Sequence, residues 1–285
     1  MAKIRHIAIF SENPTNLAKF YGDIYGMRVT GTDELGNVWA TDGYMDVALL
    51  RRRNADSPKG GIHHWGFTVA PAERDGVIAR MKPYGVEPFS PYVTAPDAHR
   101  PYAEDAVKDP DGNRFDLSTG MRDMRQSVDT AGRPLSSDAD HGDARALIKH
   151  IAIFSENPAR LAKFYTDVFG LAVTGESQGD VWVTDGYVDM ALLSRKNARS
   201  PKVGIHHWGF TIAADAKADI YGRLRAMGLP PSDPRVEDPT IDRPYVEDKG
   251  HDIDGNRFDL TTSKRDMDVE KARTRERLSQ MAPAK

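Results

Sequence analysis

Histidine and aspartate residues occur in two matching sets that could each hold a metal ion. The sets share residue types, order and nearly the same spacing: His6, His64 and Asp116 in one, and His150, His207 and Asp259 in the other. Cysteine is absent, so any metal must be held by histidine nitrogen and carboxylate oxygen. Two neutral imidazoles and one carboxylate on one side of an ion leave the opposite positions open. This arrangement suits Fe(II) or Mn(II) and lets a substrate chelate through two adjacent oxygens.

The two sets belong to two copies of one sequence. Residues 4–31 and 148–175 are identical at 20 of 28 positions, and VWATDGYMDVALL, GIHHWGFTV and DGNRFDLST also return with few changes. Each copy is too long for a solenoid repeat, so each is expected to be a domain. We predict domains at residues 1–120 and 147–263, a polar linker at 121–146, and a charged, helical C-terminal tail at 264–285.

Each copy contains a second, weaker duplication with the order βαβββ. In the first unit the strand IRHIAIF leads to Asn13-Pro14, which is typical of a helix start, and the helix ends at Gly26. The second unit repeats the order from GIHHWGFTV, with a helix at 72–84 that ends at Gly85. The predicted fold class is α+β, with four such units forming two open, curled sheets and the helices on the outside.

Alternation along the strands places the candidate ligands on one face of each sheet. Successive side chains of a strand point to opposite faces, so His6 shares a face with Ala8 and Phe10. His64 and Asp116 share faces with small or polar residues, while their apolar neighbours face the helices. A polar concave face and a packed convex face are what a cup-shaped site requires. We therefore expect each set to converge inside one cup.

The order of the motifs resembles that of a known superfamily. H-I-A-I-F, L-A-K-F-Y-x-D-x-x-G, H-H-W-G-F and D-P-D-G-N-R-F-D-L are similar to motifs of the vicinal oxygen chelate superfamily, which includes glyoxalases, bleomycin resistance proteins and extradiol dioxygenases. The resemblance implies tandem vicinal-oxygen-chelate domains. It also implies that the ligands come from the first strands of two successive units and the last strand of the second. Those positions are the two sets given above, and His63 and His206 are then expected behind the ligands or at the surface.

The sequence departs from the family pattern at three places. The family's carboxylate is usually glutamate, and the shorter aspartate brings a metal nearer the strand. Two-domain extradiol dioxygenases usually keep only the C-terminal metal site, whereas both copies here retain the ligand set. An acid–base tyrosine usually precedes the D-P-x-G-N turn, and this position is Ala106 or Lys249 here. Tyr102 and Tyr245, four residues earlier, are candidate substitutes.

Other polar residues are shared by the two copies. Arg100, Tyr102 and Glu104 of the first copy recur as Arg243, Tyr245 and Glu247. The tyrosines and glutamates are candidate acid–base residues and the arginines could hold a substrate carboxylate, although a rim of ordinary ion pairs is the simpler interpretation. Asp46 and Asp189 stand where glyoxalase I-like enzymes supply a fourth ligand. A solvent-facing carboxylate on an edge strand is the alternative there.

Three functions follow from these residues. The first is a metal-dependent, non-haem dioxygenase resembling extradiol ring-cleavage enzymes, which acts on a small, aromatic substrate with two vicinal oxygens. The second is a glyoxalase-like metal-dependent lyase or isomerase. The third is a bleomycin-resistance-like binding protein, with a pocket that Trp39, Trp182, Trp65 and Trp208 could line, although core packing is the commoner place for tryptophan. Fe(II) is the first metal expected, with Mn(II), Zn(II) and Ni(II) as alternatives.

Charge and hydropathy give no indication of a nucleic-acid or membrane partner. The chain has 39 basic and 42 acidic residues, interspersed, which gives no electrostatic footprint for nucleic acid. No apolar run reaches about 18 residues, so no spanning helix is expected, and MAKIRHIAIF is typical of a strand rather than a signal peptide. We expect a cytoplasmic protein with a small-molecule substrate, no nucleic-acid or membrane partner, and a tendency to form a homo-oligomer.

Overall fold

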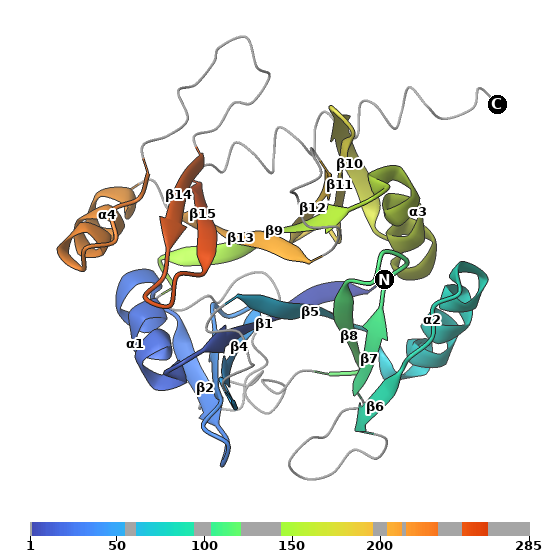
Figure 1. The fold of residues 1–285 in the computed structure, drawn as a ribbon, viewed down its shortest axis with the longest axis horizontal. Helices are drawn as coiled ribbons and strands as arrows, with labels where there is room; N and C mark the ends of the chain where they lie inside the picture. The colour runs from blue at the N-terminus through green and yellow to red at the C-terminus, as the bar shows by residue number, and fades with distance from the viewer. Residues whose placement is uncertain are drawn as a thin grey trace.

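Each sequence copy forms one curved sheet, and the two sheets lie back to back in the computed structural model (Figure 1). The structure describes residues 2–54, 61–93, 104–120, 144–195, 204–212, 215–232 and 247–261. Nearly all of the predicted linker, and the whole of the predicted helical tail, lie outside the described residues. The domain boundaries therefore stay predictions.

The first sheet contains β1 (Lys3–Ser11), β2 (Arg28–Thr32), β3 (Val38–Thr41), β4 (Asp46–Arg51), β5 (Ile62–Thr68), β6 (Ser90–Val93), β7 (Glu104–Lys108) and β8 (Arg114–Ser118). Their order across the sheet is β2-β3-β4-β1-β5-β8-β7-β6. The first strands of the two units, β1 and β5, are therefore antiparallel neighbours at the centre of the sheet.

The second sheet contains β9 (Ala146–Ser155), β10 (Ala172–Ser177), β11 (Asp180–Thr184), β12 (Asp189–Ser194), β13 (Ile205–Ile212), β14 (Glu247–His251) and β15 (Arg257–Thr261). Their order, β10-β11-β12-β9-β13-β15-β14, matches that of the first sheet. The predicted fold class, with two similar α+β domains of open, curled sheets, is confirmed. The fourth unit shows one strand fewer than the others in the part of the chain that is described.

Of the described helices, the first has its predicted start and end, and the one predicted at 72–84 is an α-helix at 74–81 between two 3-10 turns. The helices are α1 (Pro14–Tyr25), α2 (Arg74–Met81), α3 (Pro158–Phe169) and α4 (Lys217–Ala226), with short 3-10 turns at η1 (Pro71–Glu73) and η2 (Lys82–Tyr84). At the start of α1, the Asn13 side chain accepts a hydrogen bond from the Asn16 amide at 3.1 Å. Gly26 ends the helix in the left-handed conformation, with φ of 75°, which costs glycine little because it has no Cβ.

A single apolar core runs through both halves of the molecule. Tyr25 at the end of α1 stacks on Phe210 of the second sheet with ring centroids 4.2 Å apart. Phe169 at the end of α3 stacks in the same way on Phe67 of the first sheet, at 4.0 Å. The buried residues of the two copies form one continuous cluster. The two copies therefore share one core, because aromatic residues of each copy's first helix also pack against the other copy's sheet.

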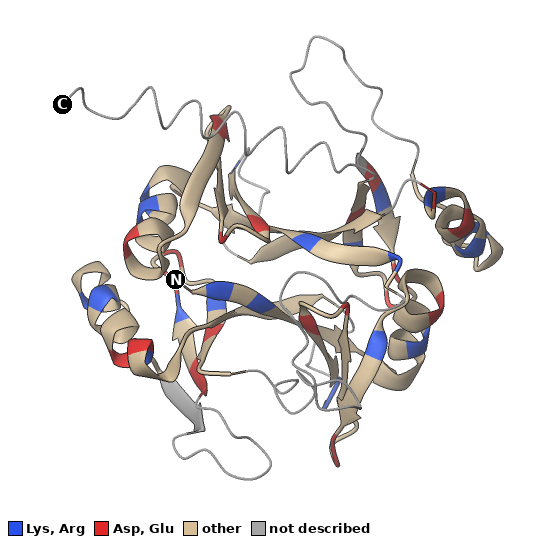
Figure 2. Ribbon diagram, turned by 180° about the vertical axis from the view of Figure 1, so that it is seen from behind, with Lys and Arg blue, Asp and Glu red and all other residues tan. Residues whose placement is uncertain are grey.

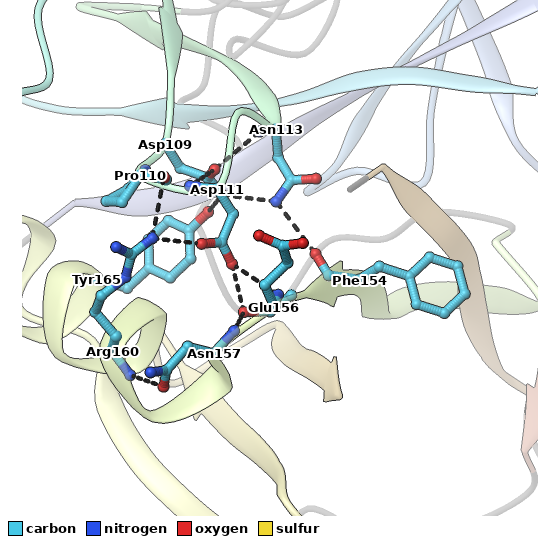
Figure 3. Close-up of polar contacts among 10 residues, drawn as sticks. Asp109, Pro110, Asp111, Asn113, Phe154, Glu156, Asn157, Arg160 and Tyr165 are labelled. Carbon is cyan, nitrogen blue, oxygen red and sulfur yellow. Dashed lines mark hydrogen bonds and ion pairs between the residues drawn. The ribbon is translucent and has the colours of Figure 1, made fainter. Parts of the chain in front are cut away.

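Polar contacts join the halves around the Asp109–Asn113 turn, which precedes β8 (Figure 3). The buried Asp109 carboxylate accepts hydrogen bonds from the Asn113 amide at 2.8 Å and from the Tyr165 hydroxyl of α3, also at 2.8 Å. Arg160 of the same helix forms an ion pair with Asp111 at 2.7 Å. The D-P-D-G-N sequence is thus a turn, as predicted, and also an anchor for the other copy's helix.

An equivalent contact joins the first helix of the first copy to the matching turn of the second copy. The Tyr21 hydroxyl of α1 donates to the Asp252 carboxylate at 2.5 Å. Asn113 and Asn256 each accept a hydrogen bond from a glycine amide just ahead of the other copy's central strand, at Gly204 and Gly61 respectively. These contacts fix the strands β5, β8, β13 and β15 relative to one another, and those strands carry four of the six candidate ligands.

The surface carries both signs of charge in each half. Every α-helix contains basic and acidic residues side by side (Figure 2). Within the described residues, no helix combines the length and the apolar character needed to cross a bilayer.

Candidate metal centres

Strand pairing brings the three predicted ligands of each copy together. His6 on β1 and Asp116 on β8 are both level with Gly66 on β5, the strand that lies between them. His64 lies two residues before Gly66 and therefore points to the same face. In the second sheet, His150 and Asp259 are both level with Gly209 on β13, and His207 precedes it by two residues. The predicted faces are thus the observed ones.

The ligand atoms of each set form a tight cluster. In the first cup, His64 Nε2 lies 3.0 Å from His6 Nε2 and 2.9 Å from Asp116 Oδ2. In the second, His207 Nε2 lies 3.1 Å from His150 Nε2 and 2.8 Å from Asp259 Oδ2. All three ligand atoms of a set lie within 4.8 Å of one another. Residues more than 50 positions apart in the chain are therefore brought within one coordination sphere.

Gly66 and Gly209 make this approach sterically feasible. A Cβ on Gly66 would lie 3.2 Å from His6 Cβ and 3.2 Å from its Cδ2. A Cβ on Gly209 would lie 3.1 Å from His150 Cβ. An added methyl group at either position would push against the imidazole that lies across the strand. The sequence reading did not assign these glycines a role, although a glycine inside a strand often marks a close approach.

In the first cup, the pKa shifts favour a neutral His6 imidazole and an ionised Asp116 carboxylate. The pKa of His6 is lowered to about 3, chiefly because the ring is buried and then because of the neighbouring His64. Burial alone would raise the pKa of Asp116, but the hydrogen bond and charge of His64 outweigh it, so the pKa is lowered. Neutral imidazole and ionised carboxylate are the forms that coordinate a metal.

A second histidine supports each central ligand from behind. His63 Nδ1 lies 2.8 Å from His64 Nδ1, and His206 Nδ1 lies 2.7 Å from His207 Nδ1. Metal binding through Nε2 would place the His64 proton on Nδ1, where His63 can accept it. Burial, then His64 and Arg114, lower the pKa of His63 to about 4, which keeps it neutral for this role. Of the two predicted places for His63 and His206, the one behind the ligands is observed.

The donor set and its spacing fit a small divalent cation. Ligands that lie about 2.1 Å from a metal at right angles to one another are separated by about 3 Å. The Nε2–Nε2 and Nε2–Oδ2 separations in both cups have this length. The second carboxylate oxygens, Asp116 Oδ1 and Asp259 Oδ1, are buried and accept no hydrogen bond from the described residues. Buried carboxylate oxygen of this kind normally has a partner, and a cation would supply one.

Of the predicted acid–base residues, Glu104 is the one whose side chain the structure describes. Glu104 and Ala106 alternate along β7 and pair with Ser118 and Asp116 of β8, so both face the cup. Ser118 Oγ lies 3.2 Å from Glu104 Oε1. Glu247 occupies the equivalent position on β14, opposite Thr261. The other four predicted residues lie outside the described residues: Arg100, Tyr102, Arg243 and Tyr245.

Asp46 does not have the place on a solvent-facing edge strand that is the simpler interpretation of the sequence. It lies on β4, level with His6 on the neighbouring strand, and its side chain is buried. Because β4 lies between β3 and β1, Asp46 is not on an edge strand. Asp189 has the same place beside His150 and is half-buried. Neither carboxylate belongs to the clusters of ligand atoms described above, so their role as a fourth ligand stays a prediction.

The four tryptophans divide into two pairs. Trp65 and Trp208 are fully buried in the shared core and do not line a cup. Trp39 packs separately with Ala8 and Ala48, on the face of the first sheet that carries His6. Trp182 is level with Ala191 in the same way and is half-buried. The pocket lining predicted for all four therefore fails for Trp65 and Trp208.

One position distinguishes the two cups beside the carboxylate. Ala106 is opposite Asp116 in the first sheet, and Lys249 is opposite Asp259 in the second. Lys249 Nζ lies 2.5 Å from Asp259 Oδ2, the same oxygen that faces His207. The absent tyrosine of the sequence comparison is thus replaced by a methyl group in one cup and by an ammonium group in the other.

Sequence comparison agrees with this architecture. The model of the Glyoxalase/Bleomycin resistance protein/Dioxygenase superfamily matches residues 3–117 and 147–260. A search of curated proteins gives no significant match.

Solved structures of similar fold include two dioxygenases and a glyoxalase. The 2,3-dioxygenase LapB from Pseudomonas sp. KL28 superposes with a TM-score of 0.68 at 17% identity, covering 92% of both chains. A Mn(II)-bound glyoxalase from Novosphingobium aromaticivorans gives 0.64 at 18% identity, covering 92% of this chain and 83% of the other. Homoprotocatechuate 2,3-dioxygenase from Arthrobacter globiformis gives 0.62 at 17%, covering 92% and 79%. At these identities the likeness establishes the fold alone.

Proposed function

Because this chain belongs to the Glyoxalase/Bleomycin resistance protein/Dioxygenase superfamily, we propose that it is a metal-dependent, non-haem dioxygenase acting on a small aromatic substrate with two adjacent oxygens. The observation that carries the proposal is the convergence of two imidazole nitrogens and one carboxylate oxygen in each cup. The similar folds of two dioxygenases support it. A binding protein without a metal would not need these buried polar groups, which are costly to bury.

The metal ion and the residues around it would have separate roles. A divalent ion held by His6, His64 and Asp116 would fix and polarise the two substrate oxygens, and Fe(II) suits this donor set. His63 would hold the His64 ring in the ligating orientation. Glu104, on the cup face two residues from Ala106, would accept the substrate hydroxyl proton at its carboxylate oxygen.

The remaining predicted residues complete the proposed pocket. Trp39 would supply an apolar wall for an aromatic ring on the same face as His6. Tyr102, Tyr245 and Glu247 are proposed as further acid–base residues, and Arg100 and Arg243 as groups that hold a substrate carboxylate.

A glyoxalase-like lyase or isomerase is the second candidate. Two observations favour it: the fold of the Mn(II)-bound glyoxalase, and the buried Asp46 carboxylate level with His6. In that reaction a carboxylate moves a proton between neighbouring carbons of an α-hydroxycarbonyl compound, and no oxygen is consumed.

Oxygen uptake tests the proposal and separates the two candidates. Protein purified without oxygen and reconstituted with Fe(II) is mixed with a panel of catechols in an oxygen electrode. We expect oxygen uptake and a product that has gained two oxygen atoms by mass spectrometry. His64→Ala should abolish both, while the exposed His251→Ala serves as the matched control and should retain them. Turnover of an α-hydroxycarbonyl compound under anaerobic conditions, without oxygen uptake on any catechol, would favour the lyase instead.

A further inference from the structure

The two cups have the same ligands but different charge beside the carboxylate. Their imidazole–imidazole and imidazole–carboxylate separations agree to within 0.1 Å. Arginines occupy matching places behind both cups, with Arg114 Nη1 3.3 Å from His63 Nε2 and Arg257 Nη1 3.1 Å from His206 Nε2. Ala106 and Lys249 therefore differ between two cups in which these other contacts are closely similar.

Lys249 pairs with the carboxylate oxygen that a metal ion would need in the second cup. Its ammonium group lies 2.5 Å from Asp259 Oδ2, and this oxygen is also the one that faces His207 Nε2 at 2.8 Å. The Lys249 side chain is only 18% exposed and that of Asp259 is 1% exposed, so the pair is held inside the cup rather than in solvent. Because the two residues are opposite each other in the β14–β15 ladder, the ammonium group starts from a backbone position next to the carboxylate.

Among the described residues, no lysine pairs with the Asp116 carboxylate of the first cup. Ala106 contributes a buried methyl group, and Asp116 Oδ2 lies 2.9 Å from His64 Nε2. Arg114 approaches the other oxygen, Oδ1, and stays at 3.6 Å, beyond hydrogen-bond distance. The ligating oxygen is therefore available to a cation in the first cup, while in the second it already carries one positive charge.

We infer that the cups are unequal, with the metal ion held by the first cup and the Lys249 ammonium group taking the cation's place in the second. A divalent ion on Asp259 Oδ2 would lie next to the ammonium group, and the repulsion between two such charges is strong where water is excluded. This inference rests on the proposed metal-dependent function and assigns it to the N-terminal half.

Metal content of the full-length chain tests the inference. The metal-free protein is titrated with Mn(II), desalted, and its manganese is measured by plasma mass spectrometry. We expect one ion per chain, lost in His64→Ala and retained in His207→Ala. Lys249→Met, which keeps the methylene stem without the charge, should raise the affinity of a second site at least about tenfold and give two ions per chain. Ala106→Lys should lower the content of the first cup, with circular dichroism confirming the fold.

The outcomes are separable from those of the proposed function. Two ions per wild-type chain at equal affinity, or one ion that is lost in His207→Ala and kept in His64→Ala, would overturn the inequality and leave the metal-dependent function intact. No change in the second site of a folded Lys249→Met protein would also overturn it. Absence of manganese from the wild type, with Fe(II) and Zn(II) giving the same result, would refute the metal centre itself.

Discussion

At the scale of single residues, the absence of a side chain matters as much as the ligands. Gly66 lies between His6 and Asp116 and is level with both, so its missing Cβ leaves the space through which they approach. The backbone at Gly66 is not in the left-handed region, and alanine is therefore allowed by conformation. A methyl group at this position should therefore displace the candidate ligands rather than prevent folding.

Gly66→Ala should therefore weaken metal binding without unfolding the protein. The added Cβ would press on His6 Cβ at 3.2 Å and tilt the imidazole away from the cluster. We expect the affinity for Mn(II) to fall by roughly 10–100-fold, the range seen when a group that supports a ligand is lost. Isothermal titration calorimetry measures this. Gly31→Ala is the control, because its Cβ would meet nothing within 4 Å; equal affinities in the two variants would contradict the account.

The convergence of the candidate ligands could be predicted from the sequence, and their surroundings only in part. Alternation along strands placed His6, His64 and Asp116 on one face because a period of two is fixed by strand geometry. The close approach at Gly66 depends on the register between strands, which a single sequence does not specify. The Lys249–Asp259 contact has the same origin, since the sequence identifies both residues but not that they are opposite each other.

At the scale of elements, the first helix of each copy makes contacts with the other copy. Its apolar spacing predicts that one face is buried, and this is correct, but periodicity does not say against which strands. The Tyr21 hydroxyl donates a hydrogen bond to Asp252 of the other copy. Non-local pairing of this kind is set by the assembled tertiary structure, so local patterns could not reveal it.

Loss of the Tyr21 hydroxyl should destabilise the whole chain. Tyr21→Phe leaves the buried Asp252 carboxylate without one of its donors, and hydrogen bonds to charged groups contribute about 1.5–3 kcal/mol. We expect the free energy of unfolding in urea to fall by this amount. Tyr25→Phe on the same helix is the matched control. Its hydroxyl is buried and makes no hydrogen bond with the described residues, so its removal should change stability little. A larger loss from Tyr25→Phe than from Tyr21→Phe would reject the assignment.

At the scale of the whole molecule, the two copies form one cooperative structure. The rings of Tyr25 and Phe169 complete the core of the opposite half, and backbone amides at Ile4 and Ile148 donate to Asp185 and Asp42 across the junction. Duplication in the sequence predicts two domains, and the fold has two similar sheets. What the sequence does not convey is that aromatic residues at the end of each copy's first helix pack on the other copy's sheet.

Unfolding of the full chain should accordingly be a single transition. Because the core is continuous, opening one half exposes apolar surface of the other, which favours all-or-none behaviour. Tryptophan fluorescence reports on Trp65 and Trp208 in the two halves, and circular dichroism reports on the helices. We expect their urea midpoints to coincide. Two separated transitions would mean that the halves fold independently.

The most direct measurement of the central claim is anomalous diffraction from crystals grown with Mn(II). We predict a manganese peak bonded to His6 Nε2, His64 Nε2 and an Asp116 carboxylate oxygen, with Lys249 still paired to Asp259 in the second cup. A peak bonded to other residues, or a first cup in which the three side chains contact one another with no ion among them, would contradict it.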